Sequence, residues 1–131
     1  MREILFRGKT KNKHREWIIG LIGKIRNLDD EIEYYITEDP EIENIWLERQ
    51  IDPSTLGQYT GLTDKNGRKV FEGDIVMFGF SPCVVKYDLT NSRYMFYDRG
   101  IYLKNGFNVD TMKTKEVVGN ITDNPELLDG E

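Results

Sequence analysis

Short apolar runs separated by turn-forming clusters recur along the whole chain of 131 residues, and this alternation is the feature that most limits its fold. In residues 31–36, for example, Ile32, Tyr34 and Ile36 alternate with other residues, as in a strand with one buried face. No long stretch has the periodicity of an amphipathic helix. The sequence therefore predicts an all-β protein, with antiparallel strands in a small barrel or sandwich and at most short helical turns.

The individual strands are bounded by Gly, Pro, Asn and Asp. They are predicted at 3–7, 17–22, 31–36, 57–63, 68–71, 74–80, 83–87, 93–97, 101–103, 107–109 and 116–121. Pro82 is expected to end the strand over 74–80, and the polar residues 8–13 are expected to form a loop. Gly20 indicates a bulge or a close approach of the backbone.

Residues 39–50 fit two interpretations. Asp39 and Pro40 are suited to begin a helix, whereas Ile45, Leu47 and Ile51 alternate as in a strand. We favour a strand over 44–51 because its neighbours are strands. The chain is expected to be a single domain, in which 1–56 form N-terminal hairpins and 57–131 form a compact barrel-like part.

Turn geometry accounts for a set of glycines and polar residues in the second half. Asn-Gly between two strand-forming runs is a strong hairpin signal, because both residues tolerate positive φ. A second Lys-Asn-Gly at 104–106 predicts a hairpin between 101–103 and 107–109, and Asn124 and Pro125 predict a closing helical turn. The residues that we expect to act structurally at turns are Gly61, Asp64, Asn66, Gly67, Glu72, Gly73 and Asp74.

Charge is distributed unevenly along the chain. The net charge is −5, but residues 1–26 carry +6, residues 27–56 carry −9 and residues 57–131 carry −2. The simpler interpretation is that neighbouring hairpins present complementary or solvated faces. The sharper hypothesis is that complementary blocks pair between two copies of the protein.

Reactive side chains are scarce. One cysteine, Cys83, lies in an apolar run and is expected to be a small buried hydrophobe, and one histidine, His14, lies in a basic loop. A Cys/His metal site within one chain is therefore excluded. In Asp64-Lys65-Asn66-Gly67 the glycine stands fourth, whereas a calcium loop of the EF-hand kind needs it sixth. We expect no catalytic residues, no metal and no cofactor.

Four motifs carry a resemblance to a known family. They are Gln58-Tyr59-Thr60-Gly61-Leu62, Asp64-Lys65-Asn66-Gly67, Phe71-Glu72-Gly73-Asp74-Ile75-Val76, and Val118-Gly119-Asn120-Ile121 followed by Asn124-Pro125-Glu126-Leu127. Together and in this order they resemble the YopX family, which phages and prophages encode. The resemblance covers nearly the whole chain and is weakest over 27–50. It implies a compact, strand-rich phage accessory protein in the cytoplasm of a bacterial host, and it supplies no activity. The turn at Gly73-Asp74 also resembles the one that opens many SH3-like barrels.

Two functions from different classes follow as hypotheses. The first is a non-enzymatic module that binds a host or phage protein and associates with itself. The alternative is binding of nucleic acid by a basic loop that carries Arg7, Lys9, Lys11, Lys13 and Arg15. A sequence pI near 5.0 counts against the alternative. No apolar run is long enough to span a membrane, so we expect no membrane partner.

Overall fold

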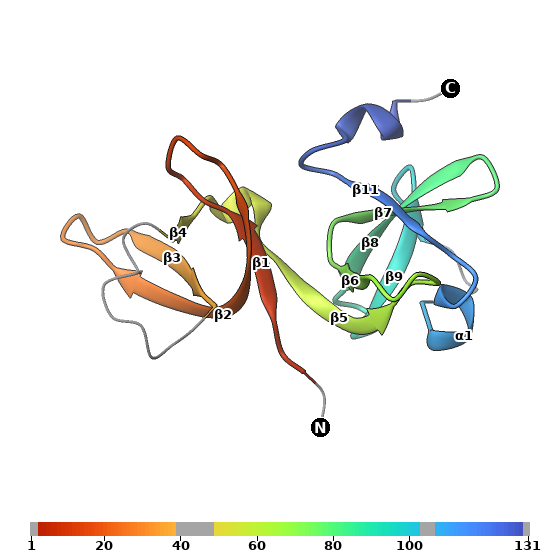
Figure 1. Ribbon diagram of the computed structural model, residues 1–131, viewed down its shortest axis with the longest axis horizontal. Helices are drawn as coiled ribbons and strands as arrows, with labels where there is room; N and C mark the ends of the chain where they lie inside the picture. The colour runs from red at the N-terminus through yellow and green to blue at the C-terminus, as the bar shows by residue number, and fades with distance from the viewer. Residues whose placement is uncertain (1–2, 39–48, 103–106, 130–131) are drawn as a thin grey trace. The chain divides into compact units, whose positions relative to one another are not determined.

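The computed structural model describes residues 3–38, 49–102 and 107–129, which form strands joined by turns and three short helical segments (Figure 1). Every pairing between the described strands is antiparallel. The predicted all-β class with short helical turns is therefore confirmed. The chain divides into two compact units, Met1–Gln58 and Tyr59–Glu131. Within the described residues, no helix has the length and apolar character needed to cross a bilayer.

The first unit is built on one antiparallel sheet. Its strands, in the order β4-β3-β2-β1-β5 across the sheet, are β4 (Gln50–Ile51), β3 (Ile32–Thr37), β2 (Trp17–Arg26), β1 (Phe6–Lys9) and the start of β5 (Gly57–Thr63). A 3-10 turn, η1 (Pro53–Thr55), follows β4 and begins at Asp52, whose side chain accepts a hydrogen bond from the backbone N–H of Ser54. An isolated bridge between Thr10 and Ile51 brings the residue after β1 beside β4.

Alternation along the strands builds the core of this unit. Ile18, Ile36 and Ile51 are at most 1% exposed and form its centre, with Phe6, Tyr34 and Leu56 packed around them. Gly20 lies in the middle of β2, where a Cβ atom would come within 2.1 Å of the carbonyl oxygen of Thr37. Of the two interpretations of Gly20, the structure has the close backbone approach.

The second unit contains a five-stranded sheet in the order β10-β9-β8-β7-β11. Its strands are β10 (Ile101–Tyr102), β9 (Arg93–Asp98), β8 (Ser81–Asp88), β7 (Asp74–Phe78) and β11 (Val117–Asn120). Within the same unit β5 continues and pairs with β6 (Lys69–Phe71). Two short helical segments complete the unit, α1 (Val109–Met112) and the 3-10 turn η2 (Pro125–Leu128).

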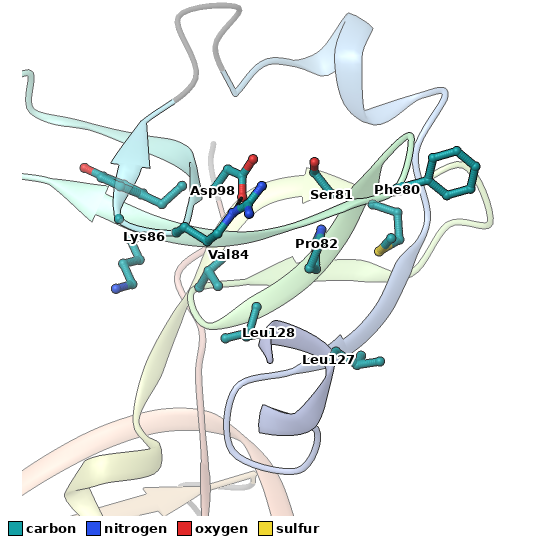
Figure 2. Close-up of a pocket in the computed structure, with 12 residues that line it drawn as sticks. Phe80, Ser81, Pro82, Val84, Lys86, Asp98, Leu127 and Leu128 are labelled. Atoms are coloured by element: carbon teal, nitrogen blue, oxygen red, sulfur yellow. Dashed lines mark hydrogen bonds and ion pairs between the residues drawn. The ribbon is translucent and has the colours of Figure 1, made fainter. Parts of the chain in front are cut away.

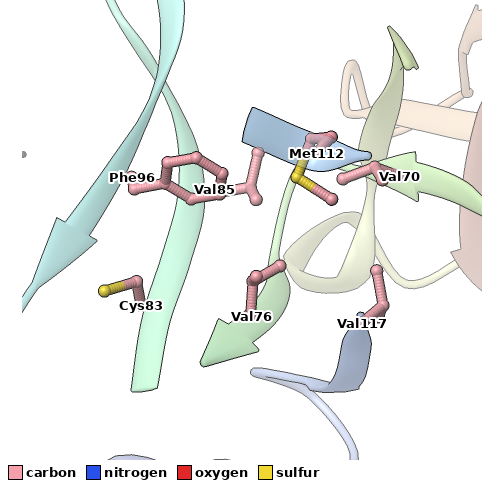
Figure 3. Packing of buried hydrophobic residues seen from close by; sticks show 7 residues of the cluster. All are labelled: Val70, Val76, Cys83, Val85, Phe96, Met112 and Val117. Atoms are coloured by element: carbon pink, nitrogen blue, oxygen red, sulfur yellow. The ribbon is translucent and has the colours of Figure 1, made fainter. Parts of the chain in front are cut away.

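One face of this sheet supplies the core of the second unit (Figure 3). The buried cluster consists of Val70, Val76, Cys83, Val85, Phe96, Met112 and Val117. Figure 3 shows Met112 of α1 between Val70 and Val85, so this short helix closes the cluster. Asn108 caps α1, because its side-chain oxygen accepts a 2.9 Å hydrogen bond from the backbone N–H of Thr111.

The structure corrects several expectations. No closed barrel is formed by the strands that the structure describes: the five-stranded sheet keeps two edges, β10 and β11. The likeness to SH3-like barrels stays a prediction. The expected strand at 107–109 is wrong, because Asn108 caps α1, which begins at Val109. The Lys-Asn-Gly turn expected at 104–106 lies outside the described residues. Pro82 does not separate two strands, since it lies inside β8 and pairs with Met77. Of the strand favoured over 44–51, residues 44–48 lie outside the described residues, and Gln50 and Ile51 form β4.

The first strand is also displaced from its expected position. It was expected over 3–7 and runs from Phe6 to Lys9, so Gly8 and Lys9 belong to β1 and not to the loop. Pairing across the sheet explains the difference, because Gly8 and Lys9 pair with Ile18 and Trp17 of β2. The glycine is needed there, since a Cβ atom would lie 2.4 Å from Cγ2 of Ile51. The polar character of residues 8–13 therefore predicts a loop where Gly8 and Lys9 in fact extend β1.

Candidate functional site

An apolar groove lies on the second unit (Figure 2). Its residues Pro82 and Val84 alternate along β8 with Cys83 and Val85 of the buried cluster, so the groove is on the other face of the sheet. Its volume is about 540 Å³, which is within the range of sites that bind small molecules or peptide side chains. Figure 2 shows Pro82 and Val84 pointing from β8 toward Leu127 and Leu128 of η2. The groove is thus walled by sheet on one side and by the C-terminal turn on the other.

The signature at the end of the chain positions that turn. A bulge in β11 falls between Val117 and Gly119, and a Cβ atom on Gly119 would lie 2.5 Å from Oδ1 of Asn124. The space left by the glycine lets that oxygen accept a 3.1 Å hydrogen bond from the backbone N–H of Asn120. Asn124 therefore holds the chain back onto β11 and does not cap η2 with its side chain, and Pro125 starts the 3-10 turn.

Charged groups stand along the same groove. Lys86 and Arg99 line it, as does Asp98, whose Oδ1 lies 3.1 Å from Nε of Arg99. The ammonium of Lys86 lies 5.9 Å from the centre of the Tyr97 ring, within the range of a cation–π interaction. An apolar floor beside two cations suits a ligand that combines an apolar group with an acidic one.

Arg99 occupies a backbone conformation that is unfavourable for it. Its φ is 51° and that of Gly100 is 85°, so both central residues of the β9–β10 hairpin are left-handed. Asn-Gly is the usual pair at such a turn, and a side chain such as arginine costs about 1 kcal/mol there. Arg99 therefore combines an unfavourable backbone conformation with a position in the groove, a combination that recurs at ligand-binding sites.

Phe80 stands at the edge of the groove and is 102% exposed. It lies at the tip of the β7–β8 hairpin, beside Gly79 with φ of 63°. Figure 2 shows its ring projecting away from the sheet. Sequence reasoning missed this site because the apolar run 74–80 predicts a buried central strand, and Phe80 looks like part of it. The signal that was available is Gly79, which ends the strand before Phe80.

The five basic residues predicted as a nucleic-acid surface differ in exposure: Lys11, Lys13 and Arg15 are exposed in one loop, and the other two are not. Arg7 is only 7% exposed and its guanidinium lies 4.9 Å from the Trp17 ring. Lys9 is half-buried and also lies over Trp17, while Lys11 and Lys13 are exposed in the β1–β2 loop. Arg15 is 3.1 Å from Oδ2 of Asp52 and donates to the carbonyl of Thr10.

The turn at 64–67, between β5 and β6, is organised by the side chain of Asp64. Oδ1 of Asp64 accepts hydrogen bonds from the backbone N–H groups of Asn66 and Arg68, and Oδ2 accepts one from Val117. Burial alone would raise the pKa of Asp64, but these three N–H donors outweigh burial and lower it. Of the Asn-Gly pair, only Gly67 has positive φ, at 81°, and Asn66 instead donates to Glu116.

The second turn follows β6. Gly73 has a φ of 95°, and the neighbouring Asp74 is fully buried, with Oδ2 accepting a 2.8 Å hydrogen bond from the backbone N–H of Phe71. Glu72 is half-buried. Gly61, within β5, has a φ of 91°, where the register of the β5–β6 pair shifts. These residues shape the backbone around the sheet, and none of them lines the groove beside β8.

The thiol of Cys83 is part of the hydrophobic core of the second unit. Cys83 is completely buried, and burial, followed by the nearby charge of Asp98, raises the pKa of its thiol to about 11. A thiol with that pKa is a poor nucleophile at neutral pH. Among the residues that the structure describes, no three His, Cys, Asp or Glu side chains are grouped so that they could hold a metal ion.

The two antiparallel sheets, with only short helical turns among the described residues, define an all-β protein. The chain belongs to the YopX family: the family model described as YopX protein matches residues 5–129. It is similar to a solved structure, the crystal structure of protein EF1440 from Enterococcus faecalis. That similarity has a TM-score of 0.59 and 22% sequence identity, and covers 98% of this chain and 99% of the other. At that identity the likeness shows a shared fold. A comparison with curated proteins found no match.

Proposed function

We propose that this YopX-family protein is a non-enzymatic, phage-encoded module that binds an extended segment of another protein in the groove beside β8. The observation that carries the proposal is the groove itself, with its apolar floor, its exposed Phe80 and two cations, of which Arg99 is paired with Asp98 and Lys86 lies near the Tyr97 ring. The segment expected to fit has an apolar side chain next to an acidic one. The apolar group packs against Pro82, Val84 and the leucines of η2, and the acidic group meets Lys86 or Arg99.

The absence of catalysis in this proposal is supported by how the polar groups are used. Asp64 accepts three backbone N–H donors, and Cys83 is buried with a raised pKa. A catalytic carboxylate or thiol needs access to a substrate, and these groups face the interior. The charged residues that do reach the groove are suited to recognition.

Nucleic acid as the ligand has less support. Arg7 is buried against Trp17, and Arg15 pairs with Asp52, so two of the five basic residues are engaged within the first unit. A net charge of −5 further weakens attraction to phosphates at physiological salt.

The proposal is tested with peptides and NMR. Three short synthetic peptides share one Leu-Phe anchor and differ in the flanking residues, which are Glu, Lys or Ser, and each is titrated into the isotope-labelled protein. We expect the Glu peptide to bind most tightly and to shift the amide signals of β8, η2 and the Arg99 turn. Preference for the Lys peptide, shifts located elsewhere, or no shifts at millimolar peptide would overturn the proposal.

A matched pair of variants sharpens that test. Phe80 and Leu89 are both highly exposed apolar residues at hairpin turns, 102% and 84% exposed, but only Phe80 borders the groove. We expect Phe80→Ser to weaken binding of the Glu peptide by about tenfold, a typical loss for one apolar anchor, whereas Leu89→Ser leaves it unchanged. Equal effects of the two substitutions would contradict the assignment.

A further inference from the structure

The outer face of β2 is an apolar stripe that the first unit leaves exposed. Alternation turns Ile18 into the core and leaves Ile19, Leu21 and Ile25 on the other side, where they are 43%, 49% and 49% exposed. Contiguous exposed apolar residues on a sheet face mark interaction surfaces more often than isolated ones do. This stripe lies in the first unit, so it is separate from the groove.

Opposite charges stand at the two ends of the stripe. The β1–β2 loop, before Trp17, exposes Lys11, Lys13 and Arg15. The β2–β3 turn, after Arg26, exposes Asp29, Asp30 and Glu31. β2 has ten residues, so these two ends are roughly 30 Å apart, at about 3.3 Å per residue. That distance exceeds the ~8 Å Debye length at physiological salt, so the two ends do not neutralise one another within one copy.

The face itself has the same polarity. Across from Trp17, the neighbouring β1 carries Lys9, which is half-buried, whereas Arg7, across from Ile19, is only 7% exposed and adds little charge to the surface. At the other end, Glu33 of β3 is paired with Ile25. A positive group therefore accompanies one end of the apolar stripe and a negative group accompanies the other, on the strands as well as in the loops.

We propose that two copies of this chain form a closed dimer by packing their β2 stripes face to face and antiparallel. A two-fold axis that crosses β2 near Leu21 reverses the second strand. The basic β1–β2 loop of each copy then faces the acidic β2–β3 turn of the other, so the same charge contact forms twice. The side chains of Ile19, Leu21 and Ile25 lose water at the centre.

The charged groups at the two ends of the stripe remain exposed, although some of them form ion pairs within one copy. Arg26 and Asp30 are 3.2 Å apart, with side chains 59% and 83% exposed, and Arg15 pairs with Asp52 while remaining 45% exposed. Exposed pairs of this kind contribute little to stability and can exchange partners. Opposite charges at two ends would also permit an open head-to-tail chain, but that arrangement leaves the apolar stripe exposed.

The test exchanges the charges at each end. One variant carries Lys11→Glu and Lys13→Glu, so that both its loop and its turn are acidic, and a second carries Asp29→Lys and Glu31→Lys, so that both are basic. Sedimentation velocity of the full chain is expected to give a dimer for the wild type and monomers for each variant alone. An equimolar mixture of the two variants is expected to restore the dimer, because both loop–turn contacts are then complementary. Raising salt from about 0.1 M to about 1 M, which shortens the Debye length from ~10 Å to ~3 Å, should weaken the mixed dimer.

Two further variants distinguish the β2 stripe from the groove as the surface that forms the dimer. Leu21→Ser should abolish the dimer, whereas Phe80→Ser, in the other unit, should leave it intact while affecting only peptide binding. A monomeric wild type, a species that grows steadily beyond two copies with concentration, or a mixture that stays monomeric would each overturn the proposal. Circular dichroism spectra matching the wild type establish that every variant is folded.

Discussion

The backbone N–H of Val117 donates a 3.0 Å hydrogen bond to Oδ2 of Asp64, a residue 53 positions earlier in the chain. The other oxygen of the same carboxylate organises the β5–β6 turn. A single buried side chain thereby ties that turn to the start of β11. Its charged form is stabilised mainly by these backbone donors, with a smaller contribution from the positive charge of Arg68, so protonation of the carboxylate weakens the link.

Asp64→Asn is expected to lower the free energy of unfolding at neutral pH by about 2–4 kcal/mol, because an amide leaves some of the three N–H donors without an acceptor and removes the charge that strengthens the others. Urea denaturation measures the loss. Asp129→Asn, at an exposed carboxylate near the end of the chain, is the control and should change stability little.

The difference in the free energy of unfolding between the wild type and Asp64→Asn should become smaller at acidic pH. The pKa of Asp64 is lowered from 3.8 in the folded protein, so its contribution is present above that value and is lost as pH falls through the folded pKa. We expect the wild type to approach Asp64→Asn in stability below about pH 4. A gap between the two that stays constant from neutral pH to pH 2 would contradict this account.

Two glycines distinguish crowding from backbone strain. Gly20→Ala would place a Cβ atom 2.1 Å from the carbonyl oxygen of Thr37, where the backbone must move, whereas Gly67→Ala has open space and only a φ of 81° to tolerate. We expect losses of more than about 3 kcal/mol for Gly20→Ala and about 1 kcal/mol for Gly67→Ala, in urea denaturation. Similar losses for both would mean that the approach of Thr37 to Gly20 is not tight in solution.

Arg99→Asn is expected to stabilise the protein. Asn suits the left-handed conformation that Arg99 adopts, and the ion pair with Asp98 that disappears is largely exposed on the arginine side. A gain of about 0.5–1 kcal/mol in the free energy of unfolding should accompany weaker binding of the Glu peptide. A loss of stability would show that Arg99 is retained for the fold and not for a ligand.

The thiol of Cys83 should be unreactive in the folded protein. Its pKa of about 11 leaves a very small thiolate fraction at pH 8, and its burial blocks reagent access. A disulfide reagent such as 5,5′-dithiobis(2-nitrobenzoate) is expected to modify it at least about 100-fold faster in urea than in buffer. Comparable rates in the two conditions would mean that β8 opens readily.

Short-range sequence patterns predicted most of the strands. The alternation in 31–36 and the glycines of the second half correspond to β3 and to the turns beside β6 and β7. The prediction of a strand at 107–109 failed because the side chain of Asn108 accepts a hydrogen bond from the backbone N–H of Thr111 and caps α1 there. The closing helical turn after Asn124 is present as η2, although the side chain of Asn124 accepts from Asn120 of β11 and does not cap that turn.

The groove was not predictable because its two walls are far apart in the sequence. Its walls come from β8 and from η2, roughly forty residues apart, and nothing local in either segment signals the other. The basic residues of the first hairpin, in contrast, were easy to see in the sequence. What could not be seen is that Arg7 and Lys9 pack on Trp17, because the register that places them there is determined by pairing across the sheet.

Strand β5 pairs through Gly57 and Gln58 with β1 and, from Tyr59 onward, with β6. A cut between Gln58 and Tyr59 therefore leaves both pairings whole, each within its own fragment, although it divides β5. The two halves of one strand serve different units, so this position is where the chain should be divided for separate expression. Fragments that end or begin there are the ones to fuse to the halves of a split reporter.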